Sequence, residues 1–131
     1  VVGVSISGTS VSTSTGNITV VGVGGSSTGT GSDGVNISGG ATITTISGSI
    51  SIDGQAGRGA SGNDGVEINN SQISSTTLVA IGPQTGSITI VGTSTDTTGE
   101  NSNGVLITTG FFIDANVQTE VSTITIMGQR S

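Results

Sequence analysis

The sequence contains no cysteine, histidine, lysine, tryptophan or tyrosine, and it has only two phenylalanines and one proline. Without cysteine and histidine, the chain lacks the usual protein ligands of zinc, haem and iron–sulfur clusters. It also lacks a thiol nucleophile and the histidine of a Ser-His-Asp triad. These absences exclude much of the metal-dependent and nucleophilic chemistry found in enzymes.

Positive charge is almost as scarce, with two Lys plus Arg against eight Asp plus Glu and a net charge of −6. A chain with so few cations cannot neutralise a run of phosphates, so no nucleic-acid binding is expected. The same argument excludes electrostatic docking to anionic lipid. No run of apolar residues is long enough for a membrane-spanning helix, so no membrane insertion is predicted.

Small and β-branched residues dominate what remains. The chain has 24 Gly, 21 Ser and 22 Thr, and its apolar residues are mainly 16 Ile and 14 Val against two Leu. Only 8% of residues are charged, and the mean hydropathy is +0.22, which argues against disorder. Because β-branched side chains suit a pleated surface, the composition predicts an all-β protein with small-residue turns.

A short apolar motif recurs along the chain and defines four units. It reads GVSIS at 3–7, GVNIS at 34–38, GVEIN at 65–69 and GVLIT at 104–108, so the unit starts are 31, 31 and 39 residues apart. Apolar residues at alternate positions predict a strand with one buried face. The inward pairs are Val4/Ile6, Val35/Ile37, Val66/Ile68 and Val105/Ile107.

Each unit then contains two further predicted strands. The second strand is marked by one apolar residue, in turn Val11, Ile43, Ile73 and Ile113. The third strand carries a second inward pair, in turn Ile18/Val20, Ile50/Ile52, Ile88/Ile90 and Ile124/Ile126. A glycine follows each third strand and is predicted to end it, in turn Gly22, Gly54, Gly92 and Gly128.

Shared apolar columns at a fixed offset are typical of a solenoid in which each unit forms one coil. The sequence therefore predicts an all-β fold, a right-handed parallel β-helix with about four coils of three short strands. Residues 1–131 form one segment, with coils that start near 3, 34, 65 and 104. The insertions at 76–85 and 93–103 fall between the columns. A β-sandwich, the alternative fold, does not require the columns to recur at a shared offset.

The chain does not begin with Met and shows no polar cap at either end of the repeats. Each coil of a solenoid is satisfied only by the coils above and below it. We therefore expect a segment excised from a longer rod. Its expected partners are further coils of the same chain or identical copies placed end to end.

The repeat resembles those of a known class of bacterial surface proteins. Its pattern is D-G-V-x-I, a Thr-rich strand and then G-[NS]-I-[TS]-[IV]-x-G, seen most clearly in GSDGVNISGGATITTISGSISIDG at 31–54. This pattern is similar to that of filamentous-haemagglutinin-like or β-strand-repeat large exoproteins. The resemblance covers all four units and implies export across the outer membrane, with a secreted or cell-surface location as part of a long adhesive rod.

One polar column precedes the first strand of the units and consists of Asp33, Asp64 and Asn103. Stacked carboxylates repel unless they are protonated or bridged, and Ca²⁺ binds through oxygen ligands. Turn formation is the favoured interpretation, because Asp and Asn accept backbone hydrogen bonds and tolerate unusual φ. No cofactor or metal is therefore predicted, and Ca²⁺ at these three residues is the alternative.

Other candidate sites are weaker. Outward hydroxyl columns on the third strands suggest a solvated face or an ice-binding array, although Asp53 and Met127 interrupt the neighbouring column. Phe111 and Phe112 should point to opposite faces, one of them toward the core. Arg58 lies in a turn with no matching carboxylate cluster in the sequence. The hydroxyl columns are Thr19, Ser51, Thr89, Thr125 and Asn17, Ser49, Ser87, Thr123.

Taken together, these patterns predict a non-enzymatic structural or adhesive segment of a bacterial fibre, with no catalytic residues. A host or cell-surface molecule is a further candidate partner. The first alternative is a polysaccharide-degrading β-helix enzyme, which requires a cleft with converging carboxylates around Asp53, Asp64 or Asp114. The second alternative is an ice-binding solenoid, which requires a flat and unbroken Thr face.

Overall fold

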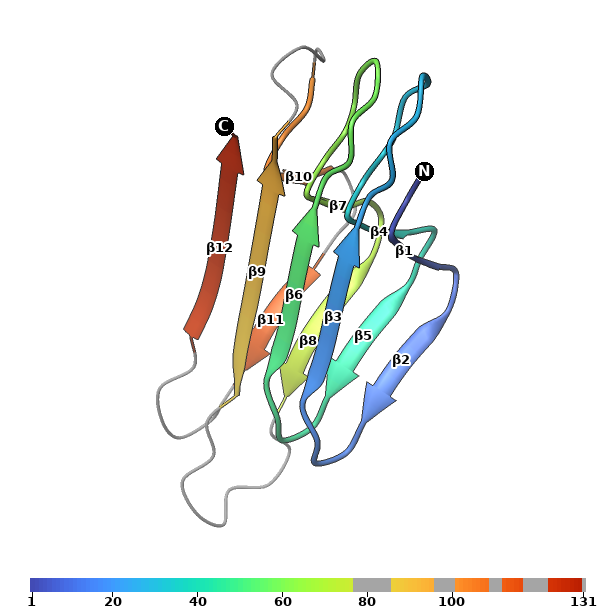
Figure 1. Cartoon of the computed structure of the whole chain (residues 1–131). Coiled ribbons are helices and arrows are strands. Elements are labelled where there is room, and N and C mark those ends of the chain that lie inside the picture. Colours follow the sequence, from blue (N-terminus) through green and yellow to red (C-terminus); the bar gives the residue numbers. More distant parts are fainter. Residues whose placement is uncertain (77–85, 96–100, 109–111, 117–122, 131) are drawn as a thin grey trace.

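The computed structural model describes residues 1–76, 86–95, 101–108, 112–116 and 123–130, with the backbone alone for 76, 112–116 and 123. All regular elements among these residues are β-strands (Figure 1). None of the described residues forms a helix that could span a membrane. The strands are β1 (Val4–Ser7), β2 (Ser10–Thr13), β3 (Ile18–Val23), β4 (Val35–Ser38), β5 (Thr42–Thr45), β6 (Ile50–Gln55), β7 (Val66–Ile68), β8 (Gln72–Thr76), β9 (Ser87–Ser94), β10 (Val105–Ile107), β11 (Phe112–Asn116) and β12 (Thr123–Arg130).

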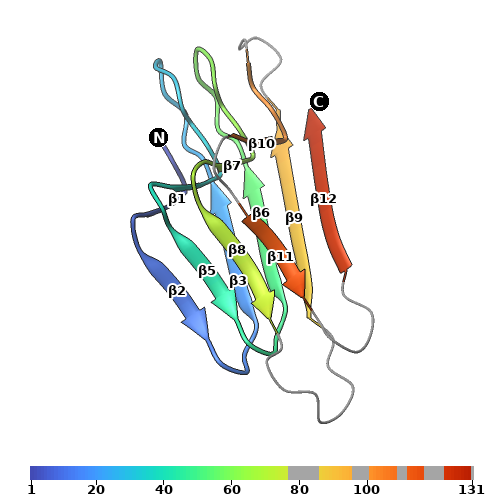
Figure 2. The same cartoon turned by 180° about the vertical axis from the view of Figure 1, so that it is seen from behind.

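The strands form three four-stranded sheets in which all pairing is parallel. Their orders are β1-β4-β7-β10, β2-β5-β8-β11 and β3-β6-β9-β12. Strands that follow one another in sequence lie in different sheets, so the chain winds through about three turns between β1 and β10. Figures 1 and 2 show the second and third sheets stacked face to face. The molecule is a β-solenoid, as the repeat predicts.

The predicted apolar columns are confirmed by the register of the sheets. Val35 pairs with Val4 on one side and with Val66 on the other. Ile50 pairs in the same way with Ile18 and Ile88. The remaining columns follow the same rule, with the pairs Val66–Val105, Val11–Ile43, Ile43–Ile73, Ile73–Ile113 and Ile88–Ile124.

The inner coils contain a fully buried apolar core. Along β6 the inward side chains of Ile50 and Ile52 are fully buried, whereas Asp53 is exposed on the outer face. Burial of each such Ile or Val contributes about 1.5–3 kcal/mol. The completely buried apolar residues are Val35, Ile37, Ala41, Ile43, Ile50, Ile52, Val66, Ile68, Ile73, Ile88 and Ile90.

The prediction that a glycine ends each third strand is wrong, because the strands run through these glycines. β6 continues past Gly54 to Gln55, and β9 continues past Gly92 to Ser94. A Cβ on Gly54 would collide with the carbonyl oxygen of Gly65, which opens the next coil. The glycine column is therefore kept small by the close approach of two backbones and does not mark strand ends.

The loops that precede β4 and β7 stack on each other as the strands do. The Gly24 amide donates to the carbonyl of Gln55 at 2.8 Å, and the Gly31 amide donates to that of Ser61 at 3.1 Å. Figure 1 shows both loops projecting side by side beyond the third sheet. This stacking aligns the residues that enter β4 with the residues that enter β7 in the adjacent coil.

Some predicted features lie partly or wholly outside the described residues. They are most of the insertion at 76–85, residues 96–100 of the turn at 93–103, and the side chains of Phe111 and Phe112.

Candidate functional site: a stacked carboxylate cluster

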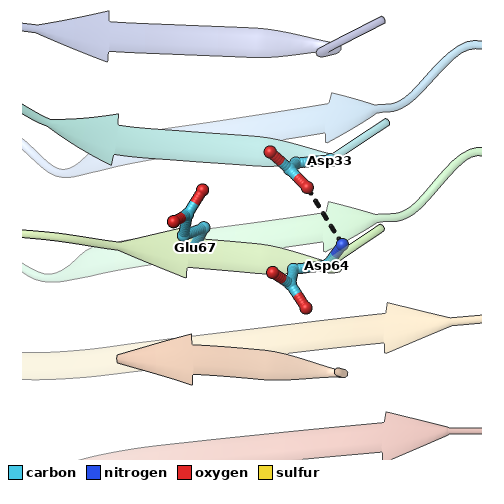
Figure 3. Close-up of side chains that lie close together, drawn as sticks. All are labelled: Asp33, Asp64 and Glu67. Carbon is cyan, nitrogen blue, oxygen red and sulfur yellow. Dashed lines mark hydrogen bonds between the residues drawn. The ribbon is translucent and has the colours of Figure 1, made fainter. Parts of the chain in front are cut away.

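Asp33 and Asp64 occupy equivalent positions, each one residue before the glycine that leads into β4 or β7. The backbones are held in register because the Gly34 amide donates to the Asp64 carbonyl at 3.0 Å. The Asp64 amide in turn donates to Oδ1 of Asp33 at 3.0 Å (Figure 3). The Asp33 side chain therefore accepts a hydrogen bond from the backbone of the next coil.

Asn103 repeats this contact one coil further along. Its backbone amide donates to Oδ1 of Asp64 at 2.7 Å, and its side-chain Nδ2 donates to the same oxygen at 2.9 Å. The sequence analysis favoured turn-forming roles for these residues. The structure shows that the two aspartates also act between coils, because each carboxylate accepts the amide of its successor in the column.

A second polar column lies directly beside this one. Oδ1 of the fully buried Asn63 accepts a hydrogen bond from the Ser32 amide at 2.9 Å. The Asn63 amide donates to Oγ of Ser102 at 3.3 Å. The two columns together supply side-chain acceptors for backbone amides at this corner, where the chain turns from its loop into the first sheet.

Glu67 brings a third carboxylate to the corner. It lies on the outer side of β7 and pairs in register with Asn36 of β4. Nδ2 of Asn36 donates both to Oε2 of Glu67 and, at 3.4 Å, to Oδ2 of Asp33. Carboxylate oxygens of Asp33, Asp64 and Glu67 lie within 4.8 Å of one another (Figure 3), and these three residues are called the carboxylate cluster below.

Burial and like charge dominate the electrostatics of the cluster. Asp33 and Asp64 are each only 3% exposed. Desolvation raises the pKa of Asp64, the two hydrogen bonds from Asn103 oppose this rise, and the charge on Asp33 adds to it. Desolvation also raises the pKa of the half-buried Glu67, with further contributions from Asp33 and Asp64. The cluster therefore favours proton uptake.

The spacing of these oxygens also suits a hard divalent cation. Two oxygens that bind one Ca²⁺ at about 2.3–2.6 Å lie up to about 5 Å apart, and the cluster falls inside that limit. The candidate Ca²⁺ ligands predicted from the sequence are Asp33, Asp64 and Asn103. The structure brings the two aspartates together with Glu67, whereas Asn103 directs its amide nitrogen, which is a donor, toward Asp64.

The sequence does not single out Glu67 and Asn36 as members of this site. Their signal was their shared position, three residues after Asp64 and Asp33, on the outer side of the first strand in each unit. The repeat pairs residues of the same column, such as Asn36 and Glu67, and gives no distance between this column and that of Asp33 and Asp64.

The other candidate residues lie apart from this cluster. Asp53 is exposed on the outer face of β6, in the column of Val21 and Val91, and therefore belongs to a different sheet from Glu67. Arg58 is exposed in the loop before β7, where its carbonyl accepts the Ser27 amide at 2.8 Å. The backbone of Asp114 pairs with Ser74, and its side chain is not among those described.

The predicted hydroxyl columns on the third sheet are in register. Ser51 pairs with Thr19 and Thr89, and Thr125 continues the column. In the neighbouring column, Oγ of Ser87 donates to Oγ of Ser49 at 3.0 Å. Hydrogen bonds along the solenoid axis therefore use part of the capacity of these hydroxyl groups.

The chain matches no protein-family model, and comparisons with curated proteins and with solved structures gave no match.

Proposed function

We propose that this chain is a non-enzymatic structural or adhesive segment of a secreted or cell-surface bacterial fibre. In this proposal four right-handed coils stack along the fibre axis, and the stack continues into further coils of the same chain or into identical copies. The proposed hand is that of nearly all crossover connections between parallel strands. The observation that carries the proposal is an apolar core that is closed in the middle coils and open at the last described strand.

The open core is clearest along β12. Ile124 and Ile126 are 45% and 44% exposed, although their partners in β9, Ile88 and Ile90, are completely buried. The four side chains belong to the same two columns, so the difference arises because no described strand covers the far side of β12. A further coil in register would cover both isoleucines, which contributes about 1 kcal/mol for each half-buried side chain.

The opposite side of the stack presents a matching surface. β1, β2 and β3 are the edge strands there, and Val4 and Ile6 are only partly buried. Parallel edge strands offer unpaired backbone groups to another strand. Because the two ends carry the same apolar columns in the same register, a contact between them does not close on itself and propagates as a filament.

Sedimentation velocity and electron microscopy of the purified chain test this proposal. We expect filaments in the wild-type protein and loss of filaments in Ile126→Asp, which places a charge at the open end of the core. Met127→Asp is the matched control, because Met127 is 53% exposed on the outer face of the same strand. Monodisperse monomers of the wild-type chain, or equal loss of filaments in both variants, would contradict the end-to-end arrangement.

A further inference from the structure

The outer face of the third sheet differs from that of the second sheet. Val21 and Val23 of β3 are each 61% exposed on it, and Met127 of β12 is 53% exposed. The described outward side chains of the second sheet are only Ser, Thr and Gln. Figure 1 looks onto the third sheet, and none of the described segments crosses its outer face. We propose that this face binds the same face of a second copy, so that two rods pair side by side.

The face carries little charge for a chain with a net charge of −6. Its outward positions are Thr19, Val21 and Val23 with their partners in β6, β9 and β12, and Asp53 is the only charged residue among them. Two such faces therefore approach without bringing many like charges together. Burial of an unpaired carboxylate costs affinity, so the contact made by each chain is weak.

The size of the face also indicates a weak contact for each chain. Four strands about 4.8 Å apart, with up to eight residues of about 3.3 Å each, give a footprint of about 500 Å². Two single chains would bury about 1,000 Å² in total, whereas stable interfaces bury about 1,200–2,000 Å². Copies stacked end to end multiply this area, so the pairing of rods rests on the proposed fibre function.

A second rod matches this face because the face is periodic. Its side chains repeat along the axis at the strand spacing, and the whole pattern repeats with each copy in the proposed rod. Another rod of the same chain has both periods, so the contact made by one copy is repeated by the others. The same patch is used on both partners, which makes the contact isologous and closes it at two rods.

Filament mass per unit length, measured by scanning transmission electron microscopy of unstained samples, tests this pairing. One 12.6 kDa chain spans four coils of about 4.8 Å in the proposed rod, so a single rod contains about 6.6 kDa per nm. We expect twice this value in the wild-type protein and the single-rod value in Val23→Asp. Ser12→Asp is the matched control, because Ser12 is exposed on the outer face of the second sheet in the same coil. It should keep the paired value.

Two further variants separate the apolar contact from the added charge and from the end contact. Val21→Thr combined with Val23→Thr keeps the β-branched shape that suits a strand and should also shift the filaments from paired to single rods. Met127→Asp should give single rods without the loss of filaments expected in Ile126→Asp. Circular dichroism checks that each variant has the fold of the wild-type chain.

The outcomes distinguish this proposal from the fibre proposal. Wild-type filaments with the mass per length of one rod, or of more than two, would overturn the pairing and leave the fibre proposal intact. Equal loss of pairing in Ser12→Asp and Val23→Asp would also overturn it, because the contact would then not be specific to the third sheet. Absence of wild-type filaments would overturn both proposals, since the contact between single chains is too small to persist alone.

Discussion

The apolar columns of the core and the carboxylate column at the corner are both built by stacking similar residues, yet repetition affects them in opposite ways. Each isoleucine added above Ile50 or Ile88 buries more apolar surface on both sides of the contact. Asp64 stacks on Asp33 in a poorly solvated site, where desolvation raises the pKa of Asp64 and the charge on Asp33 adds to the rise. Each added residue therefore strengthens an apolar column, whereas each added carboxylate increases the repulsion within a carboxylate column.

The interruptions are visible in the residues themselves. Asn103 follows Asp64 in the column and donates two hydrogen bonds to it. Asn36 stands beside Glu67 in the next column and donates to Glu67 and to Asp33. In both places an amide occupies the position where another carboxylate would increase the repulsion, and it supplies donors that the carboxylates require.

The largest effect should come from removing a buried member of an apolar column. Ile90→Ala deletes a completely buried side chain and is expected to lower the free energy of unfolding by about 2–5 kcal/mol. Ile126→Ala removes the same side chain from the same column at the open end, where the loss should be about 1 kcal/mol. Urea denaturation followed by circular dichroism measures both, and equal losses would show that the end of the core is covered in solution.

A close backbone approach should be nearly as sensitive. Gly54→Ala places a Cβ against the Gly65 carbonyl and 2.8 Å from Cγ2 of Val66, so we expect a loss of about 1–3 kcal/mol. Gly29→Ala is the control, since its nearest neighbour outside the adjacent residues, Oγ of Ser27, is 3.9 Å away. Its effect should be within about 0.5 kcal/mol. Thermal melts of the two variants decide whether packing, rather than strand termination, explains this column.

The fold could be predicted because a parallel solenoid converts a sequence offset directly into a spatial contact. Val35 and Val66 are 31 residues apart and pair in register, and Ile50 and Ile88 pair even though an insertion separates them. The role of Gly54 could not be read in this way. Its neighbour is the backbone of a different sheet, and sequence alone gives no distance between a third strand and the start of the next coil.

The carboxylate cluster was predictable only in part. Asp33 and Asp64 share a column, so their proximity followed from the repeat. Glu67 belongs to another column, and the repeat gives no distance between columns, so its approach to within 4.8 Å of the aspartates had no signal in the spacing.

Substitutions of Asp64 separate its two roles as acceptor and as charge. Asp64→Ala removes the acceptor of the part-buried Asn103 amide and should lower the free energy of unfolding by about 1–3 kcal/mol. Asp64→Asn keeps an oxygen for that amide and removes the charge that repels Asp33 and Glu67. At neutral pH we therefore expect Asp64→Asn to be at least as stable as the wild-type chain. A loss in Asp64→Asn as large as in Asp64→Ala would show that the charge itself is required.

The smallest expected effect is a dependence of stability on pH, and its sign distinguishes this cluster from an ordinary set of surface carboxylates. The pKa values of Asp64 and Glu67 are raised in the folded chain, so the folded state binds protons more tightly than the unfolded state. The resulting stabilisation is fully present below the unfolded pKa values and is lost as the pH rises through the raised folded values. The melting temperature should therefore fall from mildly acidic toward neutral pH.

Glu67→Gln tests the origin of this dependence, because it removes one titrating group and one charge that Asn36 and the aspartates face. The melting temperature of the variant should depend less steeply on pH than that of the wild-type chain. Its gain in stability should grow as the pH rises, because the repulsion that it relieves is between ionised carboxylates. Asp53→Asn is the matched control, since Asp53 is exposed on the outer face of β6 and away from the cluster. A melting temperature that rises with pH in the wild-type chain, or an equal change of slope in both variants, would mean that the carboxylates of the cluster do not repel one another in the folded protein.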